Sequence, residues 1–256
     1  MADSSFSLES RIALVTGAGT GLGRHFAWVL SRAGATVVLA GRRAEKLEAV
    51  AAQLSQGGGR VLCVALDVTD ERSVTDAVST IERQAGVIDV LINNAGTNAP
   101  RPAVDLTVGE WDSVLDTNLR GCFLVAREIA RRLIHADRPG SIVNVASVLG
   151  LRTQKGVSAY MASKAGLLHL TRGLALEWAR YHIRVNALVP GYFRTELTEQ
   201  FLNSEPGVAL LRSIPQRRTG EPADLTGPLL LLASGASRFM TGSAVVVDGG
   251  QAVGSM

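Results

Sequence analysis

A tyrosine and a lysine four residues apart are the pair in this chain best suited to chemistry. Tyr160 is followed by Lys164, and Ser147 precedes the tyrosine by thirteen residues. Side chains four apart on a helix lie on one face, one turn from each other. A free phenol has a pKa near 10, and a neighbouring ammonium favours the phenolate and lowers that pKa toward neutrality. The pair is therefore suited to acid–base catalysis.

The composition of the chain favours a functional reading of Lys164. The chain has three lysines, and its other 23 basic residues are arginine. A lysine is a compact point charge that can approach a phenol and a sugar hydroxyl where a planar guanidinium does not fit. The alternative is that Tyr160 and Lys164 are two surface residues of a helix, and the remaining motifs decide between the two.

Seven short apolar runs alternate with helical patterns along the chain. Continuous Val, Ile and Leu runs between amphipathic helices predict a parallel sheet that is covered on both faces. Right-handed crossovers then give a doubly wound, Rossmann-like α/β fold. We expect strands at 12–15, 36–40, 61–66, 87–92, 141–145, 183–188 and 244–247, and helices at 23–33, 44–54, 74–81, 111–133, 158–178 and 224–233. Thr107 and Glu110 are placed to form a capping box before the helix at 111–133.

The chain is predicted to be a single domain. No linker, charge block or internal repeat divides residues 1–256, which we expect to form one dinucleotide-binding and catalytic domain. The one long connection, roughly residues 190–221, is expected to be irregular. Connections of that length in compact domains are usually functional, so we predict a substrate lid here.

The composition also excludes several classes of function. The 26 basic residues are scattered among 23 acidic ones and aromatics are few, so no nucleic-acid site is expected. No apolar run approaches a membrane span and residues 1–7 carry no secretion signal, which predicts a cytoplasmic protein that binds no membrane. Cys63 and Cys122 are expected to be buried thiols. Neither the cysteines nor the four histidines show metal-ligand spacing, so no metal is expected.

A glycine-rich turn lies between the first expected strand and the first expected helix. Gly17, Gly21 and Gly23 form a G-x-x-x-G-x-G pattern, and Leu22 stands where the more common G-x-G-x-x-G pattern has its third glycine. Glycines allow the backbone to approach a diphosphate, and the helix N-terminus offers free N–H groups and the positive end of its dipole. The alternative is a simple glycine-rich turn.

Taken together, these motifs make the chain resemble the short-chain dehydrogenase/reductase family, in its compact branch. The resemblance extends over residues 10–250. It rests on TGAGTGLG at 16–23, NNAG at 93–96, Asn118, Ser147, the Tyr160 and Lys164 pair, and Pro190-Gly191 after the sixth strand.

The resemblance implies a role for each catalytic position. Tyr160 is implied as proton donor or acceptor at the substrate oxygen, and Ser147 as the hydrogen-bond partner that orients this oxygen. Lys164 is implied to lower the pKa of the tyrosine and to hold the hydroxyls of the nicotinamide ribose. Asn118 is implied to hold a water that extends the proton path to solvent.

The resemblance also implies a set of cofactor contacts. Asp67 should accept a hydrogen bond from the adenine amino group, and Thr195 should hold the nicotinamide carboxamide. The full set comprises Gly17, Thr20, Gly21, Leu22, Gly23, Arg42, Asp67, Val68, Asn94, Ala95, Gly96, Tyr160, Lys164, Pro190, Gly191 and Thr195.

NADP(H) is the expected cofactor. NAD preference normally needs an acidic residue at the end of the second strand, and Gly41, Arg42 and Arg43 occupy that region instead. An arginine can bind a ribose 2′-phosphate bidentately, and Arg42 is the first candidate. The alternative is that Arg42 and Arg43 are solvated and that Gly41 permits NAD(H) as well. Many NADP-using relatives also carry a basic residue inside the glycine motif, where this chain has Ala, Gly and Thr at 18–20.

The substrate should lie at the carboxyl ends of the strands, over the nicotinamide. Expected lining residues are Val148, Leu149, Gln154, Val157 and Tyr192, a mostly apolar set that fits a small-molecule ketone or secondary alcohol. Arg152, Lys155 and Arg194 could instead meet a carboxylate, phosphate or acyl carrier. The resemblance leaves open 3-oxoacyl-thioester reductases and NAD(H)-dependent polyol or sugar-acid dehydrogenases.

Three functions compete at this point. The first is a hydride-transferring oxidoreductase (EC 1.1.1.-) that interconverts a carbonyl and a secondary alcohol with the tyrosine as general acid and base. The others are an isomerase that uses the cofactor transiently and a dinucleotide sensor without turnover. The intact catalytic positions favour the first. The resemblance also implies a homotetramer, built from the helices at 111–133 and 158–178 and the edge near 245–250.

Overall fold

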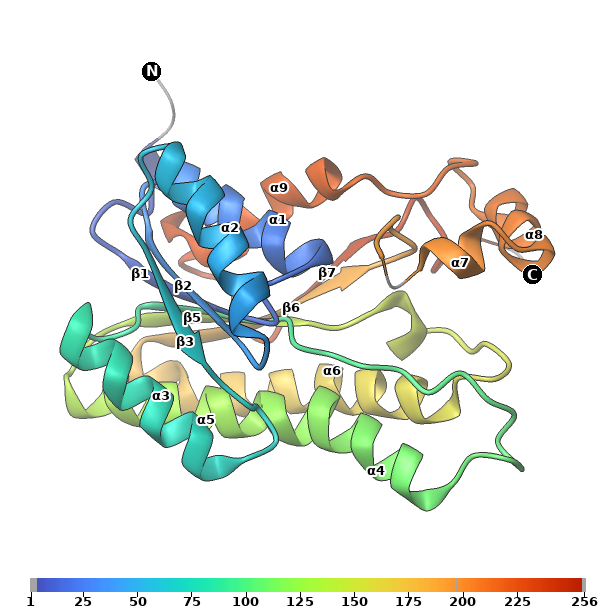
Figure 1. Cartoon of the computed structure of the whole chain (residues 1–256), viewed down its shortest axis with the longest axis horizontal. Helices are drawn as coiled ribbons and strands as arrows, with labels where there is room; N and C mark the ends of the chain where they lie inside the picture. The colour runs from blue at the N-terminus through green and yellow to red at the C-terminus, as the bar shows by residue number, and fades with distance from the viewer. Residues whose placement is uncertain (1–3, 197, 255–256) are drawn as a thin grey trace.

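The computed structural model describes residues 4–196 and 198–254 and contains one seven-stranded sheet. All neighbouring strands are parallel, in the order β3-β2-β1-β4-β5-β6-β7, so the predicted doubly wound fold is confirmed (Figure 1). The strands are β1 Ile12–Thr16, β2 Thr36–Gly41, β3 Val61–Ala65, β4 Val90–Asn93, β5 Gly140–Val145, β6 Ile183–Pro190 and β7 Ala244–Val247.

Helices cover both faces of the sheet. One face carries α1 (Gly21–Arg32), α2 (Ala44–Gln56) and α9 (Thr226–Ala233), and the other carries α3 (Glu71–Gln84), α4 (Val108–Leu115), α5 (Gly121–His135) and α6 (Ser158–Trp178) (Figure 1). Each layer buries its own apolar cluster against the strands. Phe26 of α1 and Leu229 of α9 lie in one cluster, and Ile81 of α3 and Ile129 of α5 lie in the other.

The single helix expected at 111–133 is divided. The helix begins at Val108, and the capping box of Thr107 and Glu110 is formed as predicted. A π-helical turn over Asp116–Arg120 then separates α4 from α5. Such turns commonly occur at functional sites, and this one contains Asn118.

The long connection at 190–221 is not irregular throughout, contrary to the expectation. It contains two short helices, α7 (Glu199–Leu202) and α8 (Glu205–Ser213), whose starts are favoured by an acidic first turn in each and by the Ser204 cap of the second. Its two ends meet. Gly220 N donates to Tyr192 O at 2.8 Å, and Phe193 pairs with Gly220 in an isolated bridge. The segment thus leaves and rejoins the body of the protein at one place (Figure 1).

Two smaller features complete the fold. Cys63 is exposed, not buried as expected, because it lies on the edge strand β3, whereas Cys122 is buried in α5. Burial raises the pKa of the Cys122 thiol to about 11, so the thiol is protonated at neutral pH.

Among the described residues, no helix is both long and apolar enough to cross a membrane.

The strand order reverses between β1 and β4, and this reversal positions the site. The chain leaves β1 toward one side of the sheet and leaves β4 toward the other, which opens a crevice beyond their carboxyl ends. The glycine motif follows β1, NNAG overlaps the end of β4, and Ser147 follows β5. Motifs far apart in the sequence therefore meet at one edge of the sheet.

Candidate active site

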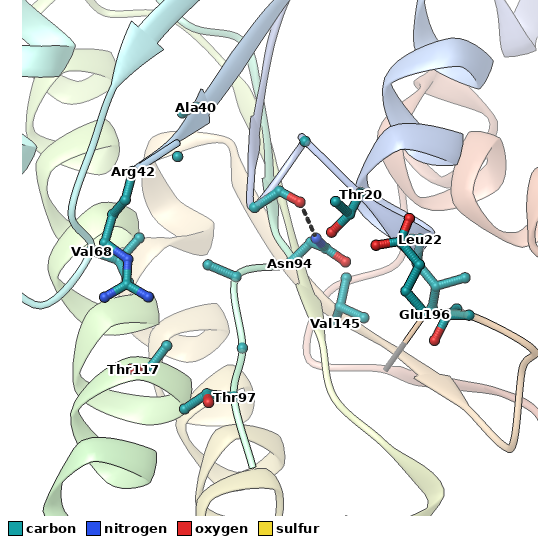
Figure 2. A pocket seen from close by; sticks show the side chains of 18 of the residues that line it. Thr20, Leu22, Ala40, Arg42, Val68, Asn94, Thr97, Thr117, Val145 and Glu196 are labelled. Atoms are coloured by element: carbon teal, nitrogen blue, oxygen red, sulfur yellow. Dashed lines mark hydrogen bonds between the residues drawn. The ribbon is translucent and has the colours of Figure 1, made fainter. Parts of the chain in front are cut away.

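A cleft of about 520 Å³ lies at this edge of the sheet. Every residue that the sequence analysis assigns to the cofactor lines it, together with the catalytic candidate Ser147. Figure 2 shows the cleft between the glycine loop near Thr20, the strand end at Asn94 and the side chain of Arg42. The structure thus gathers the predicted cofactor residues in one cavity, and their ligand contacts stay a prediction.

The glycine loop is shaped to lie against the NNAG segment. Gly17 has a φ of +64°, and a Cβ there would lie 3.0 Å from Ala95 Cα. A Cβ on Gly23 would lie 2.2 Å from Gly17 O, which no side chain can occupy without a backbone shift. Asn94 Nδ2 donates to Thr16 O at 3.0 Å and to Gly17 O at 3.2 Å. The loop therefore presents backbone and the N-terminus of α1 to the cleft, as a diphosphate requires.

Tyr160, Lys164 and Ser147 line the same cleft. Tyr160 and Lys164 come from the first two turns of α6, and Lys164 Nζ lies 5.6 Å from the centroid of the Tyr160 ring. Lys164 is 4% exposed, and its ammonium donates to Val145 O at 2.8 Å. One of three N–H donors is thereby used, and two remain for a ligand. Ser147 Oγ accepts from Leu149 N at 3.1 Å, which leaves the hydroxyl proton free to donate.

Asn118 is fully buried and does not line the cleft. Its Oδ1 accepts from Thr97 N at 2.8 Å, and its Nδ2 donates to Thr97 O at 2.9 Å and Ser163 Oγ at 3.1 Å. The side-chain amide thus ties the segment after NNAG to α6, next to the catalytic pair. A water held by this amide would compete with those contacts, and the implied water-holding role of Asn118 stays a prediction.

The adenosine end of the cleft carries a carboxylate beside an arginine. Hydrogen bonds from Thr69 N at 3.0 Å and Thr69 Oγ1 at 2.8 Å lower the pKa of Asp67, and the charge of Arg42 lowers it further. Asp67 therefore stays ionised at neutral pH and can accept a hydrogen bond from an adenine amino group. Figure 2 shows the side chain of Arg42 at the end of the strand that contains Ala40.

The five predicted substrate residues do not line this cleft. Val148, Leu149 and Val157 are buried in a small apolar cluster that also contacts Tyr160. Gln154 and Tyr192 form a polar pair, because Tyr192 Oη donates to Gln154 Oε1. Their role in substrate binding stays a prediction.

Tyr192 connects this polar pair to the predicted lid. Its ring lies 5.7 Å from that of Phe201 in α7, measured between centroids. Burial raises the pKa of Tyr192, the hydrogen bond to Gln154 lowers it, and nearby Tyr160 raises it. Tyr192 itself does not line the cleft.

Two of the three basic side chains considered as partners of an anionic substrate already form hydrogen bonds within the protein. Arg152 Nη1 donates at 2.7 Å to both Gln251 O and Gly254 O, and so anchors the C-terminal turn. Arg194 donates to Asn203 Oδ1 at 3.2 Å within the predicted lid. Lys155 is exposed.

The sequence analysis missed several polar residues that line the cleft. They come from turns and helix starts whose sequences carry no binding pattern, and only the packing brings them to the cavity. The missed polar residues are Lys46, Thr69, Thr97, Thr117, Glu196 and Thr198. Asn93, by contrast, points away and donates to Asn144 Oδ1 at 2.9 Å in the sheet.

The residues present fit a dinucleotide along the whole cleft. The glycine loop offers backbone N–H groups for a diphosphate, and Asp67 offers an acceptor for an adenine. Lys164 has free donors for a ribose beside Tyr160 and Ser147. The cleft can therefore hold a nicotinamide dinucleotide.

Comparisons with known proteins agree with this geometry. Residues 11–206 match the family described as short chain dehydrogenase. The chain is 40% identical over 246 residues to gluconate 5-dehydrogenase of Gluconobacter oxydans, covering 96% of each chain. It is 37% identical over 243 residues to a 3-oxoacyl-[acyl-carrier-protein] reductase of Thermotoga maritima, covering 95% of this chain and 98% of that protein.

A solved structure extends the likeness to the fold. A gluconate 5-dehydrogenase from Burkholderia cenocepacia, in complex with NADP and tartrate, superposes with a TM-score of 0.93 at 35% identity, over 97% of each chain. The family match, these relatives and the motifs gathered in the cleft agree. The chain belongs to the short-chain dehydrogenase family and is an NAD(P)-dependent oxidoreductase acting on CH–OH groups (EC 1.1.1.-).

Proposed function

We propose that the protein interconverts a keto group and a secondary hydroxyl group of a sugar acid such as 5-keto-D-gluconate, with NADP(H) as cofactor. The observation that carries the proposal is the joint placement of Tyr160, Lys164 and Ser147 in the cleft that also contains Arg42. The first group fits acid–base chemistry at a carbonyl, and the arginine fits a 2′-phosphate.

The substrate class is supported by relatives and by side-chain chemistry. Gluconate 5-dehydrogenases are among the similar proteins, and one of their solved structures holds NADP and tartrate, a small hydroxy acid. In this chain Gln154 and Tyr192 offer hydrogen-bonding groups near Tyr160. The apolar residues first expected around the substrate are packed into their own cluster. A polyhydroxylated substrate suits the polar pair better than an apolar ketone does.

The residues of the chain divide the chemistry between them. When bound, the nicotinamide supplies or accepts the hydride at the reacting carbon. Tyr160 gives a proton to the carbonyl oxygen in reduction and takes it back in oxidation. Ser147 donates its free hydroxyl proton to the same oxygen and orients it, since Leu149 N fixes the position of Oγ. Lys164, held by Val145 O, keeps a positive charge beside the phenol and directs its remaining donors at the ribose.

We also propose that the segment 190–221 closes over the bound substrate and that the protein is a homotetramer. The first is supported by the joined ends of the segment and by residues of its first part that line the cleft, such as Phe193 and Thr195. The second is supported by apolar side chains left open to solvent. Leu176 on α6 and Phe239 before β7 are 84% and 103% exposed in the single chain.

A substrate panel tests the proposed function. The purified protein is assayed with NADPH and with NADH against 5-keto-D-gluconate, an uncharged polyol ketone and a 3-oxoacyl thioester. The proposal expects the highest kcat/KM with 5-keto-D-gluconate and NADPH. A higher kcat/KM with the thioester would favour the acyl reductase alternative that the Thermotoga relative suggests.

Arg42→Ala should reduce the preference for NADPH. Losing a charged hydrogen-bonding partner of a phosphate costs about 1.5–3 kcal/mol, so the ratio of kcat/KM for NADPH to that for NADH should fall by about tenfold or more. The ratio is measured in wild type and variant with the same substrate. If the ratio of the two kcat/KM values were the same in both proteins, Arg42 would have no role in the choice of cofactor.

A further inference from the structure

We infer that Lys46 in the first turn of α2 is a second binding residue for the ribose 2′-phosphate, in addition to Arg42. This inference rests on the proposed NADP(H) preference and adds to it a residue that the glycine motif and the end of β2 do not contain.

Lys46 lies against the glycine loop. A Cβ placed on Gly19 would lie 2.9 Å from the Cβ of Lys46 and 3.7 Å from Leu47 Cδ2. The start of α2 is thus packed directly on the loop that follows β1, and Lys46 lines the cleft there. From this position its flexible chain can bring the ammonium over the mouth of the loop.

The contact also explains why the loop itself carries no cation at position 19. Any side chain on Gly19 would meet the Cβ of Lys46, which is fixed to the backbone of α2 and cannot swing away. The space between the glycine loop and α2 holds one side chain, and that side chain is Lys46 of the helix. The positive charge next to the loop is therefore supplied by Lys46, although the loop residues at 18–20 are uncharged.

Lys46 has no acidic partner among the residues that the structure describes. Its neighbours three and four positions away are Arg42 and Arg43, which precede α2, and Ala49 and Val50 within it. The side chain of Lys46 forms no hydrogen bond or ion pair with another residue that the structure describes. The side chain of Arg42 also forms no hydrogen bond or ion pair with a described residue, although its charge acts on Asp67. Many arginines elsewhere are paired, as Arg132 is with Glu82 at 2.8 Å.

Unpaired like charges that converge on a cleft form an anion site. Arg42, Arg43 and Lys46 raise each other's electrostatic energy in the free protein, and a bound anion relieves that repulsion. A phosphate with two negative charges matches such a cluster better than a neutral ribose hydroxyl does.

Arg42 and Lys46 approach the ribose position from two sides. Arg42 lines the same cleft as Asp67, and its charge lowers the pKa of that carboxyl, so we place it on the adenine side. Lys46 is on the side of the glycine loop, against Gly19. A phosphate on the ribose between them can be held by a planar guanidinium on one side and a point charge on the other.

The test compares two cofactor fragments in the intact protein. Dissociation constants for 2′,5′-ADP and for 5′-AMP, which lacks only the 2′-phosphate, are measured by calorimetry for wild type, Lys46→Gln and Lys46→Arg. We expect Lys46→Gln to weaken 2′,5′-ADP binding by about tenfold and to leave 5′-AMP binding unchanged. Lys46→Arg should retain part of the preference, because it keeps the charge.

Two further variants make the result specific. Arg72→Gln removes one positive charge from an exposed position on α3, outside the cleft, and should change neither constant. The double variant Arg42→Ala/Lys46→Gln should bind the two fragments with nearly equal affinity.

The failures are distinguishable. If wild type favours 2′,5′-ADP and Lys46→Gln keeps the full preference, the role of Lys46 is wrong and the NADP(H) preference stands. A Lys46→Gln protein that loses affinity for both fragments equally also contradicts a phosphate-specific role. If wild type binds both fragments equally, the cofactor proposal itself fails, and the inference fails with it.

Discussion

Tyr160→Phe should lower kcat for the reduction of 5-keto-D-gluconate by about 10² to 10⁴-fold. The variant keeps the aromatic ring and loses only the hydroxyl that exchanges a proton with the substrate oxygen. General acid–base catalysis contributes a factor of this size, equivalent to about 3–5.5 kcal/mol of the activation barrier. The measurement is steady-state loss of cofactor absorbance at saturating NADPH, with cofactor affinity determined separately and expected to change little.

The matched control is Tyr181→Phe. Tyr181 lies in the 3₁₀ turn after α6, outside the cleft, so removing its hydroxyl should leave kcat close to wild type. Equal thermal stability of the two variants shows that a loss in Tyr160→Phe is chemical. If Tyr160→Phe retained wild-type kcat, another group would have to supply the proton.

Lys164→Met should reduce kcat/KM by about 10² to 10³-fold and weaken cofactor binding by about tenfold or more. Two contributions are lost together, the positive charge beside the Tyr160 phenol and the donors that face the ribose. Because Lys164 is almost fully buried and bound to Val145 O, solvent cannot replace its ammonium without rearrangement. The measurements are steady-state kinetics and fluorescence titration with NADPH.

Lys164→Arg is the informative companion variant. It keeps the charge, but a planar guanidinium is larger than the ammonium that Val145 O holds at 2.8 Å in an almost fully buried position. We expect it to recover little activity. A Lys164→Arg enzyme with nearly wild-type kcat/KM would show that charge alone is sufficient, and a fully active Lys164→Met enzyme would contradict the assigned role.

The strands, their parallel arrangement and the edge of the sheet that carries the cleft could be predicted from the sequence because each depends on local pattern. Continuous apolar runs identified β1 and β7 closely, and 3.6-residue periodicity gave α6 with its bounds at Ser158 and Trp178. Parallel strands bring their carboxyl ends to one edge of the sheet, and for this reason the glycine loop, Asn94 and Tyr160 could be expected to lie close together there.

Features that depend on packing at a distance were not predictable. The π-helical turn at Asp116–Arg120 has no marker in the apolar pattern, which continues across it. Val148, Leu149 and Val157 are near Tyr160 in sequence and in space, yet their side chains pack on one another and not on the cleft. Lys46 looks like a solvated helical residue, and only its contact with Gly19 places it at the cavity.

The exposure of Cys63 has a similar explanation. An apolar run with a cysteine at its centre resembles a buried strand, but β3 lies at the edge of the sheet and part of it remains open to solvent. Burial of a strand depends on its place in the sheet order, and the local sequence does not specify that place.

The most direct test of the central assignment is a single-turnover measurement of hydride transfer with C4-deuterated NADPH, in wild type and Tyr160→Phe at equal saturation with cofactor. The account predicts that wild type transfers the label to the carbonyl carbon of 5-keto-D-gluconate and that Tyr160→Phe binds NADPH equally well but transfers it at least about 10²-fold more slowly. Transfer at the wild-type rate in Tyr160→Phe would contradict it.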